Sequence, residues 1–134
     1  MSSWPYELAE TWRGLRFAFL HYPRDPDGSG FVSIMLEPDD QDFDRLFDGV
    51  QADVIFYGHH HPAADQTGRA RYINPGSLGC GPASLARFSV VDIDRAGGMT
   101  IQHHAVPYDR SGLHAALVQR DLPDHEFLRQ AFFP

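Results

Sequence analysis

The sequence predicts a mixed α/β domain built around a mixed sheet, and three observations predict it. First, compact apolar runs have the length and the residue types of buried strands. Second, a stretch with apolar residues at helical spacing, 38–49, lies between two of these runs. Third, two alternating stretches late in the chain flank Arg-Ala-Gly-Gly, which is typical of a hairpin turn. The apolar runs are 15–21, 52–57 and 70–73.

The first third of the chain predicts a helix, a strand and a loop. Residues 5–13 allow a short helix that Gly14 would end, and 15–21 follows as the first buried strand. Residues 22–30 contain two prolines and two glycines, so we expect a loop there. The apolar stretch 31–36 fits either a strand or a loop.

The middle of the chain predicts a helix followed by a strand. Asp39 or Asp40 can cap a helix over 38–49, and Gly49 can close it. Residues 52–57 then form a second buried strand.

The last half of the chain predicts a turn, a hairpin and two helices. The strand at 70–73 enters Asn-Pro-Gly-Ser at 74–77, which is a turn by composition. A strand at 86–94 pairs with an antiparallel strand at 99–108. We expect two or more helices to cover one face of the sheet, each terminal helix beginning at a capping residue. The terminal helices are predicted at 111–120 and 124–133.

Composition bounds the class of protein. A chain of 134 residues with 43% apolar residues suits a single domain over 1–134. Eleven basic and 18 acidic residues give a net charge of −7, which argues against a nucleic-acid scaffold role. A small phosphorylated substrate stays compatible with this charge, because bound metal cations would reverse the local field.

The ends and the single cysteine give further expectations. Cys80 is the only cysteine, so no intramolecular disulfide forms. With no signal peptide and no apolar run of membrane-spanning length, we expect a cytoplasmic protein without membrane contact. Large apolar side chains near the start need a packing partner, which suggests that the chain begins inside a larger fold. They are Trp4, Tyr6, Leu8 and Trp12.

Histidines follow the ends of two predicted strands. The second strand ends at Gly58 and is followed by His59, His60 and His61, while the first ends in His21. Sites in open α/β sheets form outside the carboxyl ends of strands, and neutral imidazole is the commonest metal ligand. His59 and His61 are two residues apart, so their rings either meet at one site or reach two adjacent metals from a loop. A surface position is the alternative for each histidine.

The other candidate residues are expected on the surface. Adjacent histidines on the last strand should face opposite sides, and the helical histidines should be exposed. Two aspartates alternate with apolar residues, as on a solvated strand face. These residues are His103, His104, His114, His125, Asp92 and Asp94.

The ordered motifs resemble a known family. Residues 57–62 look like the Gly-His-x-His motif of calcineurin-like metallophosphoesterases, and 74–79 resembles the Asn-Pro-Gly-Ser segment of the small bacterial phosphodiesterase branch. Residues 21–23 stand where that branch has His-Gly after a strand. The tail, 106–109 and 122–123, is similar to the closing strand and last helices. The match spans the chain and corresponds to the C-terminal portion of a four-layer αββα sandwich.

The resemblance implies roles for individual residues. His61 resembles a ligand of the first metal, and His21 and His59 resemble ligands of the second. The family holds two divalent cations, drawn from manganese, zinc, iron or nickel, which activate water and bind phosphoryl oxygens. Further residues are expected to support the metal ligands or, equally, to form a tight turn. They are His60, Asn74, Gly76 and Ser77.

The chain also departs from the family pattern. The Asp-x-His, Gly-Asp and Gly-Asn-His segments of the family do not occur before His21, and Tyr22 replaces the usual glycine. Histidines alone bring no negative charge, so they provide for one cation or none rather than two. We therefore expect a chain that is incomplete or inactive alone, and that needs a missing N-terminal half or associates with itself through an open sheet edge.

The predicted function is metal-dependent hydrolysis of phosphomonoesters or phosphodiesters. This expectation depends on the resemblance and on the three histidines. The alternative is a non-catalytic metallophosphoesterase-like interaction module, or a domain that binds a single metal. The sequence itself does not distinguish these alternatives or name a substrate.

Overall fold

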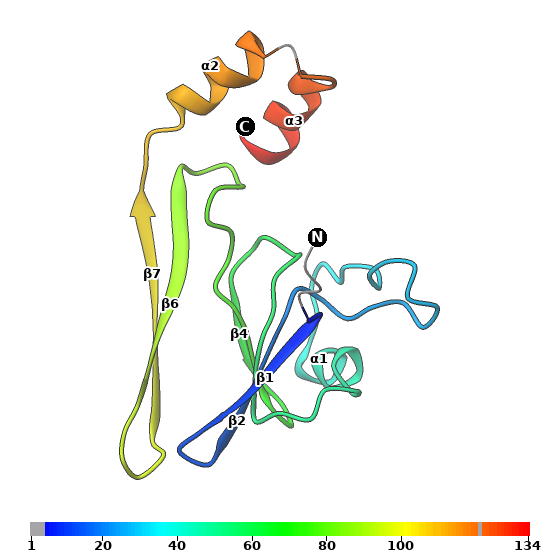
Figure 1. Cartoon of the computed structure of the whole chain (residues 1–134), viewed down its shortest axis with the longest axis vertical. Coiled ribbons are helices and arrows are strands. Elements are labelled where there is room, and N and C mark those ends of the chain that lie inside the picture. The colour runs from blue at the N-terminus through cyan, green and yellow to red at the C-terminus, as the bar shows by residue number, and fades with distance from the viewer. Residues whose placement is uncertain (1–4, 121) are drawn as a thin grey trace.

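Figure 1 shows the computed structural model, which describes residues 5–120 and 122–134. Seven strands and three helices are present in these residues. In chain order they are β1 (Glu7–Trp12), β2 (Leu15–Leu20), α1 (Asp40–Leu46), β3 (Val54–Phe56), β4 (Ala64–Thr67), β5 (Arg71–Asn74), β6 (Leu85–Ile93), β7 (Met99–Pro107), α2 (Ser111–Gln119) and α3 (His125–Phe132).

The central sheet has five strands in the order β1-β2-β3-β5-β4. Strands β2, β3 and β5 are parallel, and β1 and β4 pair antiparallel at the two edges. The fold is therefore mixed α/β with a mixed sheet, as the sequence predicts. The parallel strands carry side chains buried on both faces of the sheet, with Ile55, Tyr72 and Ile73 fully buried.

Helix α1 covers one face of the sheet. Asp39 caps it, since its side chain accepts from the Asp42 backbone N–H while the Asp42 carboxylate accepts from the Asp39 N–H. Phe43 and Phe47 turn inward and stack on Tyr72, with ring centroids 5.4 Å apart in both pairs. The predicted helix is confirmed over a shorter range, with Asp39 as its N-cap, and it ends at Phe47 instead of Gly49.

The end of the β6–β7 hairpin packs on part of the opposite face. Phe17, Val54 and Ile73 of the sheet form a second core, and side chains from the end of the hairpin pack on it. The hairpin residues in this core are Ile93, Met99 and Ile101. The layers are thus helix, sheet and hairpin, and the predicted hairpin is confirmed.

The two terminal helices exist, but the expectation that they cover the sheet is wrong. Helices α2 and α3 pack against each other beyond one end of the hairpin (Figure 1). Neither begins with a side-chain cap, because Arg110 and Asp124 make no capping hydrogen bond. The outer face of the hairpin consequently leaves Phe88, Val90 and Val106 exposed.

The N-terminal helix predicted at 5–13 is wrong, because this stretch is strand β1. Arg13 and Gly14 both have positive φ, 53° and 83°, which is the geometry of a two-residue hairpin turn into β2. The Trp12 ring packs on Phe17 at 4.9 Å, so pairing with the neighbouring strand overrides helical propensity. Trp4 lies outside the described residues.

Two further features of the chain concern its surfaces. Strand β4 was not predicted, because its residues are polar and lie at a sheet edge. Among the described residues, no helix has the length and apolar character needed to cross a lipid bilayer.

Candidate functional site

Adjacent parallel strands bring His21 and His59 together. His21 directly follows β2, and Gly58 and His59 lie just beyond β3, its parallel neighbour. The Gly58 N–H donates to the His21 carbonyl at 2.8 Å, which fixes the two strand ends side by side. The ring atoms His21 Nε2 and His59 Nδ1 then lie 3.1 Å apart. The predicted convergence of the two histidines is present.

The backbone at His59 is strained. Its φ is +63°, a left-handed conformation that costs about 1–2 kcal/mol for a residue with a Cβ. The His60 N–H donates back to the Gly58 carbonyl at 2.7 Å, which closes a tight turn. The His59 ring is held by aromatic neighbours, Phe31 at 4.7 Å and Tyr22 at 5.3 Å. Packing therefore holds His59 against its conformational preference.

The structure accommodates Tyr22 after His21, although tyrosine is much larger than glycine. Its side chain is only 2% exposed and points into the core beside α1. Its ring lies 6.3 Å from Phe47 and 6.2 Å from Tyr57. Packing of the Tyr22 ring in the core thus stabilises the end of β2, and the ring does not block the approach of the His59 loop.

The environment keeps His21 neutral. Burial lowers its pKa, and the neighbouring His59 and His61 rings lower it further. An imidazole that is neutral at pH 7 has a free lone pair for a metal ion. The lowered pKa therefore favours the form of His21 that can bind a cation.

His61 lies farther from the pair. It is exposed, and its ring centroid is 5.9 Å from that of Phe132 on α3. A pocket of about 470 Å³ joins the three consecutive histidines to the C-terminal helix. It is lined by Ile34, His59, His60, His61, Pro62 and Phe132.

The Asn-Pro-Gly-Ser segment forms a turn that supports the histidine loop. Asn74 is 2% exposed; its side-chain N–H donates to the His60 carbonyl, and its oxygen accepts from the Gly76 N–H at 2.9 Å. Ser77 Oγ accepts from the backbone N–H groups of Gly79 and Cys80, at 3.1 and 2.7 Å. These contacts shape two loops, and none places an oxygen beside the His21–His59 pair.

The His21–His59 pair offers two ring nitrogens to a single cation and no oxygen that could bridge two cations. Two nitrogens bound to a tetrahedral zinc lie about 3.3 Å apart, close to the 3.1 Å between the His21 and His59 rings. Within 5–120 and 122–134, however, no three His, Cys, Asp or Glu side chains are grouped to hold a metal ion. Two adjacent dications need bridging carboxylates, and this site contributes none.

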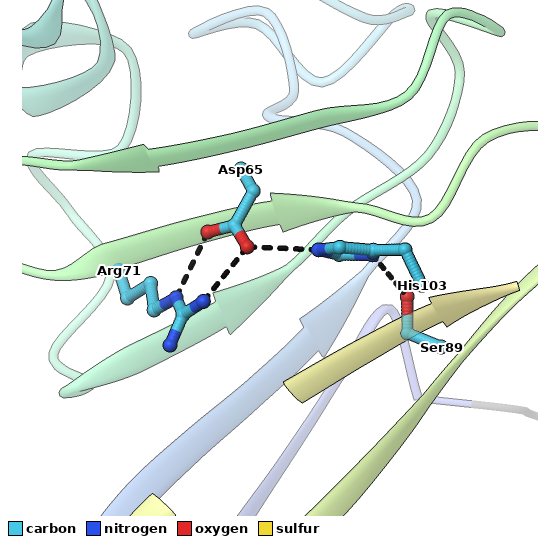
Figure 2. A network of polar contacts seen from close by, with 4 residues as sticks. All are labelled: Asp65, Arg71, Ser89 and His103. Carbon is cyan, nitrogen blue, oxygen red and sulfur yellow. Dashed lines mark hydrogen bonds and ion pairs between the residues drawn. The ribbon is translucent and has the colours of Figure 1, made fainter. Parts of the chain in front are cut away.

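A second cluster of polar side chains, which contains His103, was not predicted from the sequence. Figure 2 shows His103 on β7 between Ser89 on β6 and Asp65 on β4, with Arg71 on the far side of the carboxylate. His103 Nε2 lies 2.8 Å from Asp65, His103 Nδ1 lies 2.9 Å from Ser89, and Arg71 binds Asp65 through two 2.8 Å contacts. This network joins the edge of the sheet to the hairpin.

An apolar groove borders His21 on the open side of the sheet. It has a volume of about 690 Å³ and runs along β1 and β2. Its walls include Tyr6, Leu8, Phe19, Phe56 and Pro75. Exposed aromatic and aliphatic side chains in one groove are typical of a binding surface.

The family is decided by a sequence match. A family profile described as the calcineurin-like phosphoesterase superfamily domain matches residues 3–96. The chain belongs to the calcineurin-like phosphoesterase superfamily. No protein of curated function matches the sequence.

Solved structures agree with this superfamily fold. A hypothetical protein from Pyrococcus horikoshii matches with a TM-score of 0.75 and 18% identity, over 98% of this chain and 52% of its own. A metallophosphoesterase from Sphaerobacter thermophilus matches with a TM-score of 0.62 and 16% identity, over 91% and 56%. Vps29 from Entamoeba histolytica, solved with zinc, matches with a TM-score of 0.51 and 14% identity, over 78% and 63%. This superfamily chain thus spans between half and two thirds of the length of these relatives.

Proposed function

We propose that this chain forms the histidine-bearing part of a metal-dependent phosphoesterase site. His21 and His59 bind one divalent cation, zinc or manganese in the first instance, and His61 completes the set when its ring turns from Phe132. The observation that carries the proposal is the 3.1 Å approach of His21 Nε2 and His59 Nδ1 at neighbouring strand ends. Membership of the phosphoesterase superfamily supports the same chemistry.

Neighbouring residues of the chain hold the histidine loop in a fixed orientation. Tyr22 and Phe31 hold the His59 ring, and Asn74 holds the carbonyl of His60, so the loop is preorganised before a ligand arrives. A divalent cation, when bound, supplies Lewis-acid polarisation of a phosphoryl oxygen. The substrate would be a phosphomonoester or phosphodiester in the pocket that His59, His60 and His61 line.

Hydrolysis by this site needs carboxylate ligands that the described residues do not bring near the histidines. We propose that residues 1–134 act as one domain and that a further segment or a second copy supplies those carboxylates. The free edge of β1, with all six of its residues exposed, is the place where such a partner would pair with the sheet.

Zinc titration with matched variants tests the cation site. We expect calorimetry to show one zinc per chain, and His59→Ala to weaken zinc binding by at least about 100-fold, more than loss of an outer-shell partner costs. His104→Ala is the control, because His104 stacks only on Phe88 at the hairpin surface. Equal zinc affinity of the His59→Ala and wild-type proteins would contradict the site.

Hydrolysis is measured separately with bis(p-nitrophenyl) phosphate and manganese. Activity that His59→Ala abolishes and His104→Ala retains supports the phosphoesterase proposal. Zinc binding without any hydrolysis, in the chain and in a longer form that includes superfamily carboxylates, would overturn catalysis while leaving the metal site intact.

A non-catalytic interaction module is the second candidate. The apolar groove of about 690 Å³ beside His21 favours it, since a hydrolytic site does not require exposed Tyr6 and Leu8 there. In that case Leu8→Glu would abolish partner or self-association and leave zinc binding unchanged, which light scattering and calorimetry would show.

A further inference from the structure

Arg87 is held in a defined position by the Asn-Pro-Gly-Ser turn. Its backbone N–H donates to the Ser77 carbonyl at 3.2 Å, and its side-chain stem crosses directly over Gly76. A Cβ at Gly76 would lie only 2.6 Å from Arg87 Cδ, and Gly76 has a φ of +90°. The glycine therefore both makes the turn and leaves room for the arginine.

Arg87 is the one arginine that is partly buried and has no side-chain partner among the described residues. Seven other arginines donate to a carboxylate or a backbone carbonyl, and three have no such contact but are exposed. The seven are Arg16, Arg24, Arg45, Arg69, Arg71, Arg110 and Arg129, and the three are Arg13, Arg95 and Arg120.

The carboxylate of the neighbouring network is already engaged. Arg87 shares the inner face of β6 with Ser89, two residues along, because side chains alternate on a strand. Ser89 leads through His103 to Asp65, which Arg71 binds with two contacts. Asp65 thus has its counter-ion, and no ion pair forms between Arg87 and any described carboxylate.

The Arg87 side chain lines a pocket next to the histidines. This pocket has a volume of about 430 Å³ and is enclosed by the loop after β3, the loop before β6 and the start of β6. His61 and Pro62 belong both to its wall and to the wall of the histidine pocket. An anion in the Arg87 pocket would therefore be separated from the histidine site only by these two residues.

We propose that Arg87 binds a phosphoryl group of the ligand, distinct from the group that reaches His21 and His59. A guanidinium offers a planar fork of donors that matches phosphate oxygens, so an anion in this pocket would satisfy Arg87 donors that no described residue accepts. In a protein with a net charge of −7, an arginine that lines a pocket and has no side-chain partner among the described residues is a place where an anion can bind. The proposal rests on the proposed function for the nature of the ligand, a phosphoester. It makes Arg87 a substrate-binding residue that selects ligands carrying a second phosphoryl group.

Pyrophosphate binding tests the proposal without metal or turnover. In buffer with EDTA, calorimetry should show that the whole chain binds pyrophosphate more tightly than inorganic phosphate. Arg87→Gln should weaken pyrophosphate binding by about 10-fold or more, as loss of a charge-assisted contact does. Arg87→Lys should keep part of the affinity, because it keeps the charge without the fork.

Arg95→Gln is the matched control, since Arg95 is an exposed arginine at the hairpin turn. It removes the same charge from the protein and should leave pyrophosphate binding within twofold of wild type. Equal losses in Arg87→Gln and Arg95→Gln, or no pyrophosphate binding by the wild type, would overturn the proposal. Unfolding curves of the variants show whether a loss arises from misfolding, in which case Arg87→Lys gives the deciding value. Because zinc and hydrolysis are absent, failure here is distinct from failure of the phosphoesterase proposal.

Discussion

Two clusters that contain histidine lie in different parts of this chain and have different charge environments. The His21–His59 pair sits at the carboxyl ends of two parallel strands, with aromatic neighbours and no carboxylate. His103 lies on the β6–β7 hairpin and contacts Asp65 at the edge of the central sheet, and Asp65 is also bound by Arg71. One cluster has lone pairs and no counter-charge, and the other has its charges balanced.

The difference indicates what each cluster does. A carboxylate that is paired with an arginine and contacts a histidine holds two elements together, here the edge of the sheet and the hairpin. Ring nitrogens 3.1 Å apart, on a backbone strained at His59, would gain stability from a shared cation under the proposed function. Backbone strain thus distinguishes the His21–His59 pair, and ion pairing distinguishes the His103 network.

The largest expected effect comes from removing the carboxylate of the structural cluster. Asp65→Ala should lower the free energy of unfolding by about 1–2 kcal/mol, because Arg71 and His103 lose their shared partner at a partly exposed site. Zinc affinity should stay unchanged. Urea denaturation and zinc calorimetry measure the two quantities.

Asp92→Ala is the control for that change. Asp92 lies on the same hairpin but is exposed on its outer face. We expect its stability to stay within about 0.5 kcal/mol of wild type, as for other surface changes. If both variants lose the same stability, the Asp65 network does not join the hairpin to the sheet.

The different backbone conformations of His59 and His103 should produce a smaller difference in stability. His59→Gly should be more stable than His59→Ala by about 1 kcal/mol, because glycine adopts the positive φ without a Cβ penalty. At His103, on a regular strand, the order should reverse by about 0.5–1 kcal/mol. The four variants are compared by urea denaturation. If the His59→Ala protein were as stable as the His59→Gly protein, or more stable, the backbone at His59 would not be strained.

Much of the fold was predictable because the signals are local. Asp39 as a cap, the 3.6-residue spacing of Phe43 and Phe47, and the Arg95–Gly98 turn each depend on neighbouring residues only. The same reasoning failed at 5–13, where the strand depends on pairing with β2 rather than on its own residues. The placement of the terminal helices failed for a related reason, because it is set by tertiary packing.

The candidate site, like the fold, was predictable only where it depends on local signals. His21 and His59 each end an apolar strand, and parallel pairing of those strands brings them together. Asp65 gave no such signal, since it belongs to a polar edge strand far from His103 in the sequence. The role proposed for Arg87 depends on which partners it lacks, and a lack of partners is visible only in three dimensions.

The smallest expected effect is the acid dependence of the structural cluster. The hydrogen bonds from Arg71, followed by the contact with His103, lower the pKa of Asp65 below its usual value of 3.8 despite its partial burial. Because the folded pKa is lower than the unfolded one, the network stabilises the fold above about pH 4 and loses this contribution as the pH falls through the folded pKa. Asp65→Asn, which cannot titrate, should therefore lose less stability than wild type between about pH 4 and pH 2. Thermal unfolding across this range measures the difference, which solvent exposure keeps small. Parallel pH profiles for the two proteins would mean that the Asp65 carboxylate contributes nothing through its charge. The contrast between a charge-balanced cluster and a charge-free one would then be one of geometry alone.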